Sequence, residues 1–241
     1  MSLTLATHGA LHLPAALDAP ALAAIEAALS TLPADRAGQR LASLPALAPM
    51  LAPTGAIGRH AAGHLGHAAN PVRAILFDKS ATMNWALGWH QDRTIAVRDR
   101  IDTPGFGPWT LKSGIRHVAP PQALLDRMLT LRIHLDPVDA DNAPLLIAPG
   151  SHRHGRVAEG DVAALVTRYG THACLAARGD IWLYATPILH ASDAAKNPRR
   201  RRVLQLDYSA DALPGGLAWL GIGSPLLPSG ERDRQPCQLA G

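Results

Sequence analysis

The chain has little cysteine, no long apolar run and no early basic charge. Its two cysteines, Cys174 and Cys237, are too few for a disulfide framework or a cysteine-based zinc ribbon, and they fit a reducing compartment. No apolar run approaches the ~20 residues that a membrane-spanning helix needs. The first basic residue is Arg36, so the charged start of a secretory signal peptide is missing. We therefore expect a cytoplasmic protein with no membrane partner.

Size and apolar content predict one folded domain. Apolar residues make up 47% of the 241 residues, which excludes disorder for most of the chain. Barrels and sandwiches of this length commonly form a single domain. We expect a core over about 72–208, a helical support over 1–71 and a loose tail over about 224–241, where proline, glycine and arginine are frequent.

The charge balance is mildly basic, and arginine dominates it. The formal net charge is +4, and 20 of the 23 basic residues are arginine. A protein that binds single-stranded nucleic acid needs a basic groove with stacking aromatics, but aromatics are only 4% of this chain. The one basic run, Arg199–Arg202, has no interleaved aromatic residue. We therefore expect no nucleic-acid partner, and the sequence gives no indication of oligomeric state.

The middle of the chain has the texture of a β-protein. Short segments rich in β-forming residues are separated by glycine, proline, asparagine and aspartate, which favours a sandwich or barrel. A strand is also predicted at 9–13, and helices at about 18–32, with Asp18 as cap, and at 161–168. Residues 41–68 are expected to be helical or irregular. The stretch 99–117 is too long for an ordinary connection, so we expect a binding loop or lid there. The predicted core strands are 72–77, 85–89, 129–135, 145–148, 173–176, 181–184 and 203–208.

Two His-x-Asp pairs are candidates for a metal site. Residues i and i+2 of a strand point to the same face, so His90 with Asp92, or His134 with Asp136, could hold one metal ion. A further histidine would complete the facial set of three ligands found in non-haem iron oxygenases. Twelve histidines and sixteen aspartates give roughly one such pair by chance. Asp136 precedes a proline and could instead cap a strand end, but spacing alone leaves both pairs open.

A second pattern lies toward the C-terminus. A turn, a strand and a second turn end on His190, and Ser192 and Arg201 follow it. An arginine at the mouth of a strand beside a metal-binding histidine can grip a carboxylate with two hydrogen bonds. The alternative is that the whole run Arg199–Arg202 is a solvated basic patch or a phosphate site. Because alternate residues of a strand face opposite ways, at most two of the four arginines can share a pocket.

These patterns together resemble the phytanoyl-CoA dioxygenase family, a branch of the Fe(II)/2-oxoglutarate oxygenases. The resemblance rests on the order of the motifs over roughly 72–208, and the conjunction is specific although each piece is weak. One departure is Ala143, where the family usually has glycine in a hairpin. The motifs are Trp89-His90-Gln91-Asp92, the strand 130–136, the segment Asn142 to His152 with its Pro149-Gly150-Ser151 turn, His190 with Ser192, and Arg201 eleven residues beyond His190.

The resemblance implies a mainly β fold, a double-stranded β-helix of jelly-roll or cupin-like barrel type with flanking helices. It implies His90, Asp92 and His190 as ligands of Fe(II), and so selects the first His-x-Asp pair. It implies that Arg201, assisted by Ser192, binds the distal carboxylate of the cosubstrate 2-oxoglutarate. The implied reaction consumes O2, hydroxylates an unactivated C–H bond of a small-molecule substrate, and releases succinate and CO2.

Other polar residues are weaker candidates. Lys79 and Asn84 flank the turn before the predicted metal strand, so either could bind a carboxylate of the cosubstrate. Arg132 and His134 share one strand face, and Trp109 and Lys112 lie in the expected loop. We take these four as candidate substrate contacts. A second metal site at His60 and His64 is disfavoured because no carboxylate lies near them in the sequence.

Two other functions stay open at this point. A cupin-type hydrolase or isomerase could use the same metal ligands without 2-oxoglutarate, and it would have no need of Arg201. A barrel that has lost activity is disfavoured by the intact ligand set. The family name does not settle the substrate, because the fold is reused for many compounds.

Overall fold

The computed structural model describes residues 2–33 and 38–222. The predicted tail at 224–241 and Cys237 lie outside this part of the chain, whereas Cys174 is buried with a free thiol. Within the described ranges, no helix is long and apolar enough to cross a membrane.

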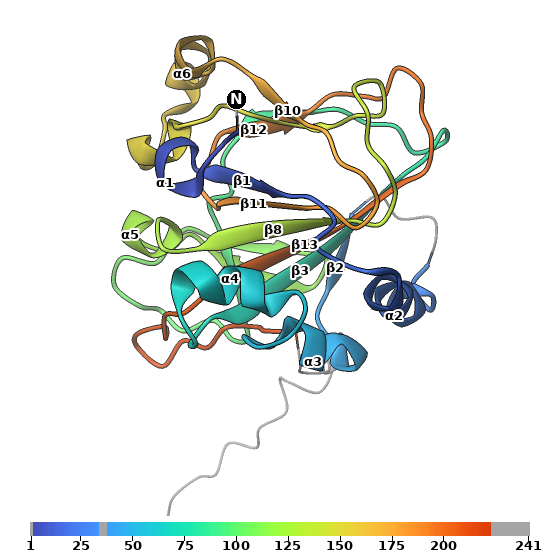
Figure 1. Cartoon of the computed structure of the whole chain (residues 1–241). Helices are drawn as coiled ribbons and strands as arrows, with labels where there is room; N and C mark the ends of the chain where they lie inside the picture. The colour runs from blue at the N-terminus through green and yellow to red at the C-terminus, as the bar shows by residue number, and fades with distance from the viewer. Residues whose placement is uncertain (1, 34–37, 223–241) are drawn as a thin grey trace, which may run out of the picture.

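Antiparallel sheets form the body of the protein (Figure 1). Two of them pack face to face in a jelly-roll arrangement, which confirms the predicted fold class. A six-stranded sheet has the order β1 (Ala10–Leu13), β11 (Ile181–Ala185), β8 (Leu129–His134), β13 (Arg201–Ser209), β3 (Asn70–Lys79) and β2 (Gln39–Leu41). A four-stranded sheet has the order β10 (His172–Cys174), β9 (Leu145–Ile147), β12 (His190–Ser192) and β4 (Leu87–His90). A three-stranded sheet has the order β5 (Ile95–Val97), β7 (Ile115–Val118) and β6 (Trp109–Lys112).

Alternation along the central strands of the large sheet separates the core from the site. On β8, Leu131 and Ile133 belong to the main apolar core, whereas Arg132 faces the pocket between the sheets. On β13, Leu204 and Leu206 likewise belong to this core. The apolar face packs against α2 (Ala19–Leu29), α3 (Ala48–Leu51) and α4 (Gly58–Leu65), which cover it in Figure 1. The polar face is therefore left to line the interior between the two sheets.

The N-terminal region supplies strands as well as helices. The predicted strand at 9–13 is β1, which pairs with β11, but β2 was not expected. Asp18 caps α2 by accepting a hydrogen bond from the Ala21 amide at 2.9 Å, as its sequence position predicted. The shorter helices are α1 (Leu5–His8), α5 (Gln122–Leu125) and α6 (Val162–Tyr169).

The expected long loop at 99–117 is wrong in its second half. Strands β6 and β7 form a hairpin there, joined by Ser113 and Gly114, which both have positive φ values of 52° and 75°. Such a pair is typical of a tight two-residue hairpin turn whose twist matches that of the strands. The sequence signal was present, since β-forming residues flank a Ser-Gly pair on both sides.

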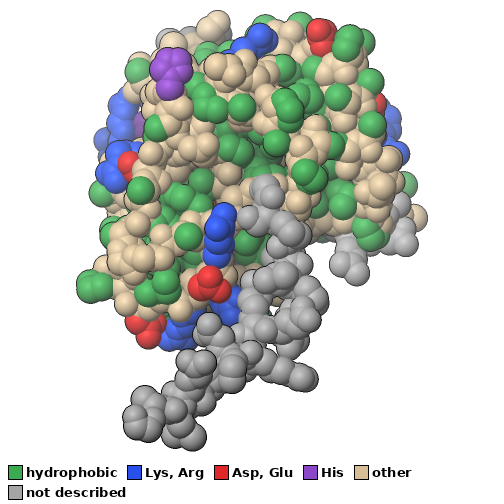
Figure 2. All heavy atoms as spheres, turned by 90° about the horizontal axis from the view of Figure 1, so that it is seen from below, with side chains coloured by type: hydrophobic (Ala, Val, Ile, Leu, Met, Phe, Trp, Pro, Cys, Tyr) green, Lys and Arg blue, Asp and Glu red, His purple; other side chains and the backbone are tan. Residues whose placement is uncertain are grey.

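The surface seen from below Figure 1 is mostly apolar and uncharged (Figure 2). Its visible Lys, Arg, Asp and Glu side chains are few and scattered, so the described residues on this face form no basic stripe. Much of the arginine of the chain is used elsewhere, within the site and in ion pairs.

We predict that Leu131→Ala lowers the free energy of unfolding by about 2–5 kcal/mol, because the truncation leaves a cavity in the core of the central strand. Leu131 has 0% exposure. The matched control is Leu111→Ala at a side chain that is 70% exposed, where we expect a change within about 0.5 kcal/mol. Denaturant unfolding of both variants checks this. Equal losses would contradict the assignment of the core.

Candidate metal centre and cosubstrate pocket

Three predicted ligands come together on adjacent strands. His90 ends β4, and its Cα partner across the sheet is His190 of β12. Asp92 follows β4 by two residues. The candidate donor atoms of the three side chains all lie within 4.8 Å of one another, and they form the one such metal-binding set among the described residues. The second His-x-Asp pair is not part of any such set.

Backbone carbonyls fix the orientation of both imidazoles. The Nδ1 atom of His90 lies 2.7 Å from the Gly88 carbonyl oxygen, and that of His190 lies 2.9 Å from the Ile188 carbonyl oxygen. A proton on each Nδ1 makes these contacts hydrogen bonds and leaves both Nε2 lone pairs free for a metal. Burial, followed by the neighbouring charge of His90, lowers the pKa of His190 to about 4. His190 is therefore neutral near pH 7, as a metal ligand must be.

Asp92 is held ionised by a buried arginine. Burial alone would raise the pKa of Asp92, but the charges of Arg73, His190 and His90 together outweigh it and hold the pKa well below its usual range, with Arg73 contributing most of the three. One guanidinium nitrogen of Arg73 donates to Oδ2 of Asp92 at 2.8 Å, and its Nε donates to Asp207. Gln205 also approaches Oδ2 of Asp92, at 3.5 Å. Oδ1 of Asp92 has no hydrogen-bond partner among the described residues, so it is free for a metal.

Two residues outside the predicted set hold the metal strands in place. The side-chain amide of Gln91 donates to the Gly155 and Pro187 carbonyl oxygens at 2.8 and 2.7 Å, and its oxygen accepts from the Val157 amide at 2.9 Å. Ser151, in the predicted Pro-Gly-Ser turn, accepts from the Leu189 amide at 2.9 Å. The bonds to Pro187 and Leu189 fix the chain that leads into His190. Arg73 was missed because it belongs to no recognisable spacing, and Gln91 was named within the His-x-Asp motif without a role.

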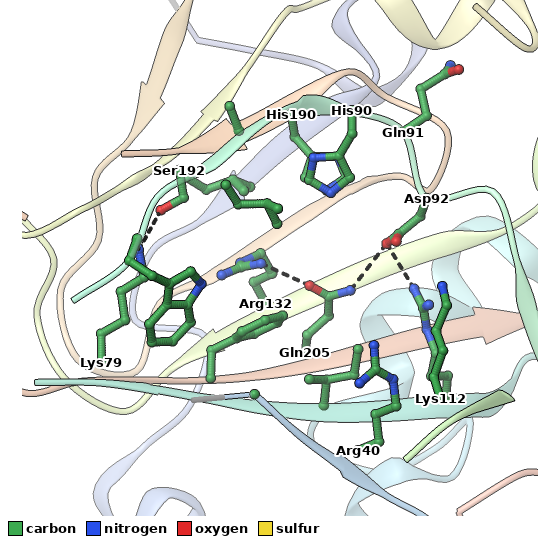
Figure 3. A pocket seen from close by; sticks show the side chains of 18 of the residues that line it. Arg40, Lys79, His90, Gln91, Asp92, Lys112, Arg132, His190, Ser192 and Gln205 are labelled. Atoms are coloured by element: carbon green, nitrogen blue, oxygen red, sulfur yellow. Dashed lines mark hydrogen bonds and ion pairs between the residues drawn. The ribbon is translucent and has the colours of Figure 1, made fainter. Parts of the chain in front are cut away.

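A cavity of about 450 Å³ opens beside the three ligands and between the sheets (Figure 3). Asp92 is the one carboxylate among its described lining residues. The cationic side chains that line it are Arg40, Arg73, Lys79, Arg93, Lys112, Arg132 and Arg201.

Arg201 enters this cavity as a buried cation without an acidic partner. Its exposure is 2%, it donates to the Ala143 carbonyl oxygen, and its Nε has no hydrogen-bond partner. Burial, followed by the charge of Arg132, lowers the pKa of Arg201 to about 9. A buried charge is expensive unless it is paired, and no described carboxylate forms an ion pair with Arg201. The residue therefore fits the carboxylate of a ligand.

Lys79, Ser192 and Arg132 surround Arg201 at the same end of the cavity. Nζ of Lys79 donates to Oγ of Ser192 at 3.1 Å and to the Trp85 carbonyl oxygen at 2.7 Å. Arg132 lies over the Phe77 ring at 5.0 Å and donates to Gln205 at 2.9 Å. Burial, followed by the charges of Arg201 and Arg132, lowers the pKa of Lys79 to about 8. This end of the cavity is suited to one carboxylate group of a ligand.

Comparison with protein families gives a decisive match. The family model described as "Phytanoyl-CoA dioxygenase (PhyH)" matches residues 5–203. The chain belongs to this family. It is an Fe(II)- and 2-oxoglutarate-dependent oxygenase, which confirms the resemblance found in the sequence and its two cofactors. The match begins well before the motifs, which cover only about 72–208. No curated protein matches the chain.

Solved structures show the same fold at low sequence identity. The apo form of EctD from S. alaskensis is 19% identical, with a TM-score of 0.63 over 92% of this chain and 79% of that one. HygX from Streptomyces hygroscopicus, solved with nickel and 2-oxoglutarate, is 14% identical, with a TM-score of 0.58 over 86% and 87%. SnoK, a non-heme alpha-ketoglutarate-dependent carbocyclase from nogalamycin biosynthesis, is 16% identical, with a TM-score of 0.56 over 85% and 80%.

Not all candidate residues of the oxygenase reach the cavity. Lys112 and Arg132 line it, but Trp109 and His134 do not. Trp109 packs against the apolar cluster beneath β5 and β7, and His134 is 2% exposed with neither ring nitrogen bonded. Asn84 also lies outside the cavity lining. Its amide forms two hydrogen bonds with Ala195, at 2.7 and 2.9 Å, so it holds the loop after β12 and is not placed to bind a carboxylate of the cosubstrate.

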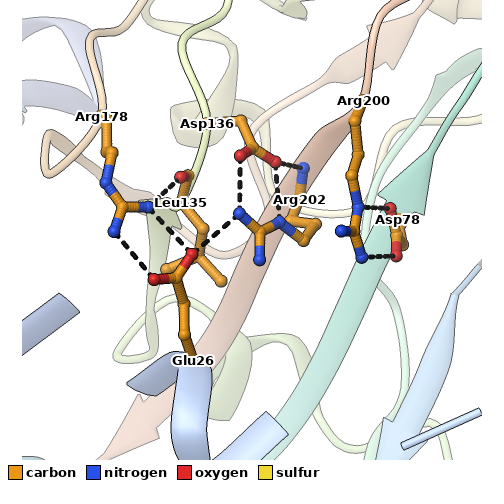
Figure 4. Close-up of polar contacts among 7 residues, drawn as sticks. All are labelled: Glu26, Asp78, Leu135, Asp136, Arg178, Arg200 and Arg202. Atoms are coloured by element: carbon orange, nitrogen blue, oxygen red, sulfur yellow. Dashed lines mark hydrogen bonds and ion pairs between the residues drawn. The ribbon is translucent and has the colours of Figure 1, made fainter. Parts of the chain in front are cut away.

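The arginine run divides as strand geometry predicts. Arg201 faces the cavity, whereas Arg200 and Arg202 face carboxylates on the outside (Figure 4). Arg202 contacts Asp136 at 2.7 Å and Glu26 of α2 at 2.8 Å, and Arg200 contacts Asp78 at 3.2 Å. Arg199 pairs with Asp139. Asp136 therefore holds the end of a strand, which was the alternative to a metal-binding role.

We predict opposite pH effects on cosubstrate binding and on stability above pH 8. Affinity for 2-oxoglutarate should fall as pH rises through about 8, because Lys79 then loses the charge that attracts a carboxylate. Between pH 8 and about 10.4, the ordinary pKa of lysine, Lys79 is protonated in the unfolded chain but not in the folded protein. The free energy of unfolding of the ligand-free protein therefore rises with pH over this range. Calorimetric titrations at several pH values check the first effect. Lys79→Met should flatten this pH dependence, and an unchanged profile would contradict it.

Proposed function

We propose that this oxygenase, acting as a single domain, hydroxylates an unactivated C–H bond of a small molecule, with His90, Asp92 and His190 as the iron ligands. The observation that supports it best is the set of three donor atoms within 4.8 Å, beside a buried arginine that has no acidic partner. A hydrolase or isomerase that used the same ligands would have no need of such an arginine. Family membership supports the same choice.

Each protein group has a separate role in this proposal. Fe(II), 2-oxoglutarate and O2 supply the oxidising chemistry, which releases succinate and CO2 as one oxygen atom enters the substrate. His90 and His190 would present their Nε2 atoms to the metal, because their Nδ1 atoms face carbonyl oxygens. Asp92 presents Oδ1, because Arg73 occupies Oδ2. The metal set therefore carries one negative charge and leaves coordination positions open.

The far end of the cavity orients the cosubstrate. Arg201 would receive its distal carboxylate with two parallel hydrogen bonds. Ser192 would donate its hydroxyl proton to the same carboxylate, and Lys79 would add charge from the other side of Ser192. Fixing one end of the dicarboxylate before the reaction lowers the entropy cost of the productive arrangement.

The test of this proposal is succinate formation by the full chain with Fe(II), 2-oxoglutarate and O2, across a panel of small molecules. We expect substrate-dependent succinate and a product heavier by one oxygen atom. Substitution of His90, Asp92 or His190 by alanine should abolish both signals and weaken metal binding by more than 100-fold, since ligands matter more than the groups behind them. His64→Ala, at an exposed side chain of α4, is the control and should change neither. Succinate formation that survives Asp92→Ala would refute the ligand set.

A second prediction concerns Arg201 alone. Losing a buried charge-assisted pair costs on the order of 2–5 kcal/mol. Arg201→Ala should therefore weaken 2-oxoglutarate binding by about 30-fold or more. The matched controls are Arg199→Ala and Arg200→Ala, which remove the same charge from the neighbouring outward-facing positions and should have much smaller effects. Anaerobic titration of Fe(II)-loaded protein measures all three affinities. Similar losses in all three would identify the run as a surface patch.

A further inference from the structure

A second group of cations lies near Asp92, at the end of the cavity opposite Lys79 and Ser192. Figure 3 shows Arg40 and Lys112 on the side of Asp92, whereas Lys79 and Ser192 lie at the opposite end. Arg40 comes from the edge strand β2 and Lys112 from the hairpin strand β6. Neither strand belongs to the motifs by which the family was recognised.

Arg40 and Lys112 have no acidic partner in the described part of the chain. Nε of Arg40 is buried and has no hydrogen-bond partner. The one hydrogen bond of the Lys112 ammonium is a long contact to Oγ1 of Thr94 at 3.4 Å. Arg73, by contrast, is fully committed, because it pairs with both Asp92 and Asp207.

Holding these charges together is unfavourable without an anion. Burial, followed by the charges of Arg40 and then Arg73, lowers the pKa of Lys112, and burial followed by the charge of Arg73 lowers that of Arg40. Asp92 is the one carboxylate among the described residues that line the cavity; Arg73 binds one of its oxygens, and the proposed metal would take the other. A ligand with its own negative charge would relieve this repulsion.

The cosubstrate cannot satisfy both ends of the cavity. Its distal carboxylate is assigned to Arg201 and Ser192, and its other end is directed at the metal ligands. Arg40 and Lys112 therefore remain for a different molecule, which lies at the end of the cavity opposite Lys79, the cross-strand partner of Arg201. That is the position expected of the substrate in the proposed reaction.

We propose that the substrate carries an oxyanion, either a carboxylate or a phosphate-type group, that Arg40 and Lys112 bind. This inference rests on the proposed function and names the class of its substrate. Arg40 offers a planar fork that matches two oxygens of such a group, and Lys112 adds a point charge. Anchored at this end, the uncharged part of the substrate faces the metal ligands.

The first test is a calorimetric titration of the full chain, saturated with Ni(II) and 2-oxoglutarate, with inorganic phosphate and separately with acetate. Saturation keeps both probes away from Arg201. We expect saturable binding of at least one probe, weakened at least tenfold by Arg40→Met and by Lys112→Met. The tighter probe identifies the type of oxyanion. The control is Arg116→Met on β7. This residue lies in the same three-stranded sheet as Lys112 but outside the cavity lining, so its substitution should leave the affinity within twofold.

The second test uses turnover. In the succinate assay, free acids should be accepted in preference to their methyl esters. Lys112→Met should lower the ratio of turnover with the acid to turnover with the ester by at least tenfold. Arg40→Lys should restore part of what Arg40→Met loses, and this separates lost charge from misfolding. The proposal is overturned if the loaded wild-type chain binds neither probe, or if the variants bind both as tightly as wild type.

Failure of the proposed function has a different signature. If the wild-type chain binds no 2-oxoglutarate, the proposed function falls, but the anion site is still decided. Phosphate and acetate titrated into metal-free Arg201→Met protein, with and without Lys112→Met, then report on Arg40 and Lys112 alone. A tenfold loss on Lys112→Met supports the site, and no loss refutes it.

Discussion

The site depends on one buried arginine between two carboxylates. Arg73 of β3 donates to Asp207, its Cα partner on β13, and to Asp92, which follows β4 of the opposite sheet. Thr130 of β8 donates to the other oxygen of Asp207 at 3.0 Å. This chain of charged hydrogen bonds connects three strands of the six-stranded sheet to the segment that follows β4 of the four-stranded sheet, where the proposed metal ligands lie. Removing one partner of such a buried pair typically costs about 3–5 kcal/mol, because it leaves a bare charge.

The same interaction sets the electrostatics of the proposed metal-ligand set. Arg73 neutralises Asp207 and keeps Asp92 ionised, and it also orients the carboxylate so that one oxygen remains free. The two histidines are oriented by carbonyl oxygens instead, which adds no charge. Structure and electrostatics therefore arise from the same few contacts, and a substitution at Arg73 would disturb the packing of the two sheets and the ligand set together.

The sequence predicted the parts of the site that are local. Strand geometry made His90 with Asp92 one of two candidate pairs, and the resemblance of the motif order to the family selected this pair together with His190 and Arg201. Arg73 was not recognisable, because it is one of 20 arginines and its partner Asp207 is 134 residues away. Its role follows from the pairing register of β3 and β13, which spacing along one strand does not reveal. The role of Gln91, although the residue lies within the His-x-Asp motif, was not predictable for a similar reason, since its partners come from two distant loops.

The errors also have physical causes. The hairpin of β6 and β7 was predicted as a loop because glycine and proline in the first half of the stretch 99–117 outweighed the β-forming residues in the second half. His134 shares a strand face with Arg132, but it lies among buried residues beyond the cavity lining. A shared face predicts the direction in which a side chain points, but not how far along the strand the cavity extends. Asn84 was expected to bind a ligand, yet its amide satisfies a neighbouring loop. A position next to a site in the sequence predicts ligand binding less well than hydrogen-bonding groups that remain without a partner in the structure.

The cavity has a consequence for how ligands exchange. Its lining brings seven cationic side chains around a single carboxylate, so in solution it attracts small counter-ions from the surrounding salt. Each anionic ligand that enters must displace them, and succinate, which is itself a dianion, meets the same attraction when it leaves. Screening over the Debye length of about 8 Å at physiological ionic strength acts on both steps. The concentration of salt and the identity of its anion therefore affect the kinetics of this enzyme. Higher salt slows the binding of anionic ligands and speeds the dissociation of succinate.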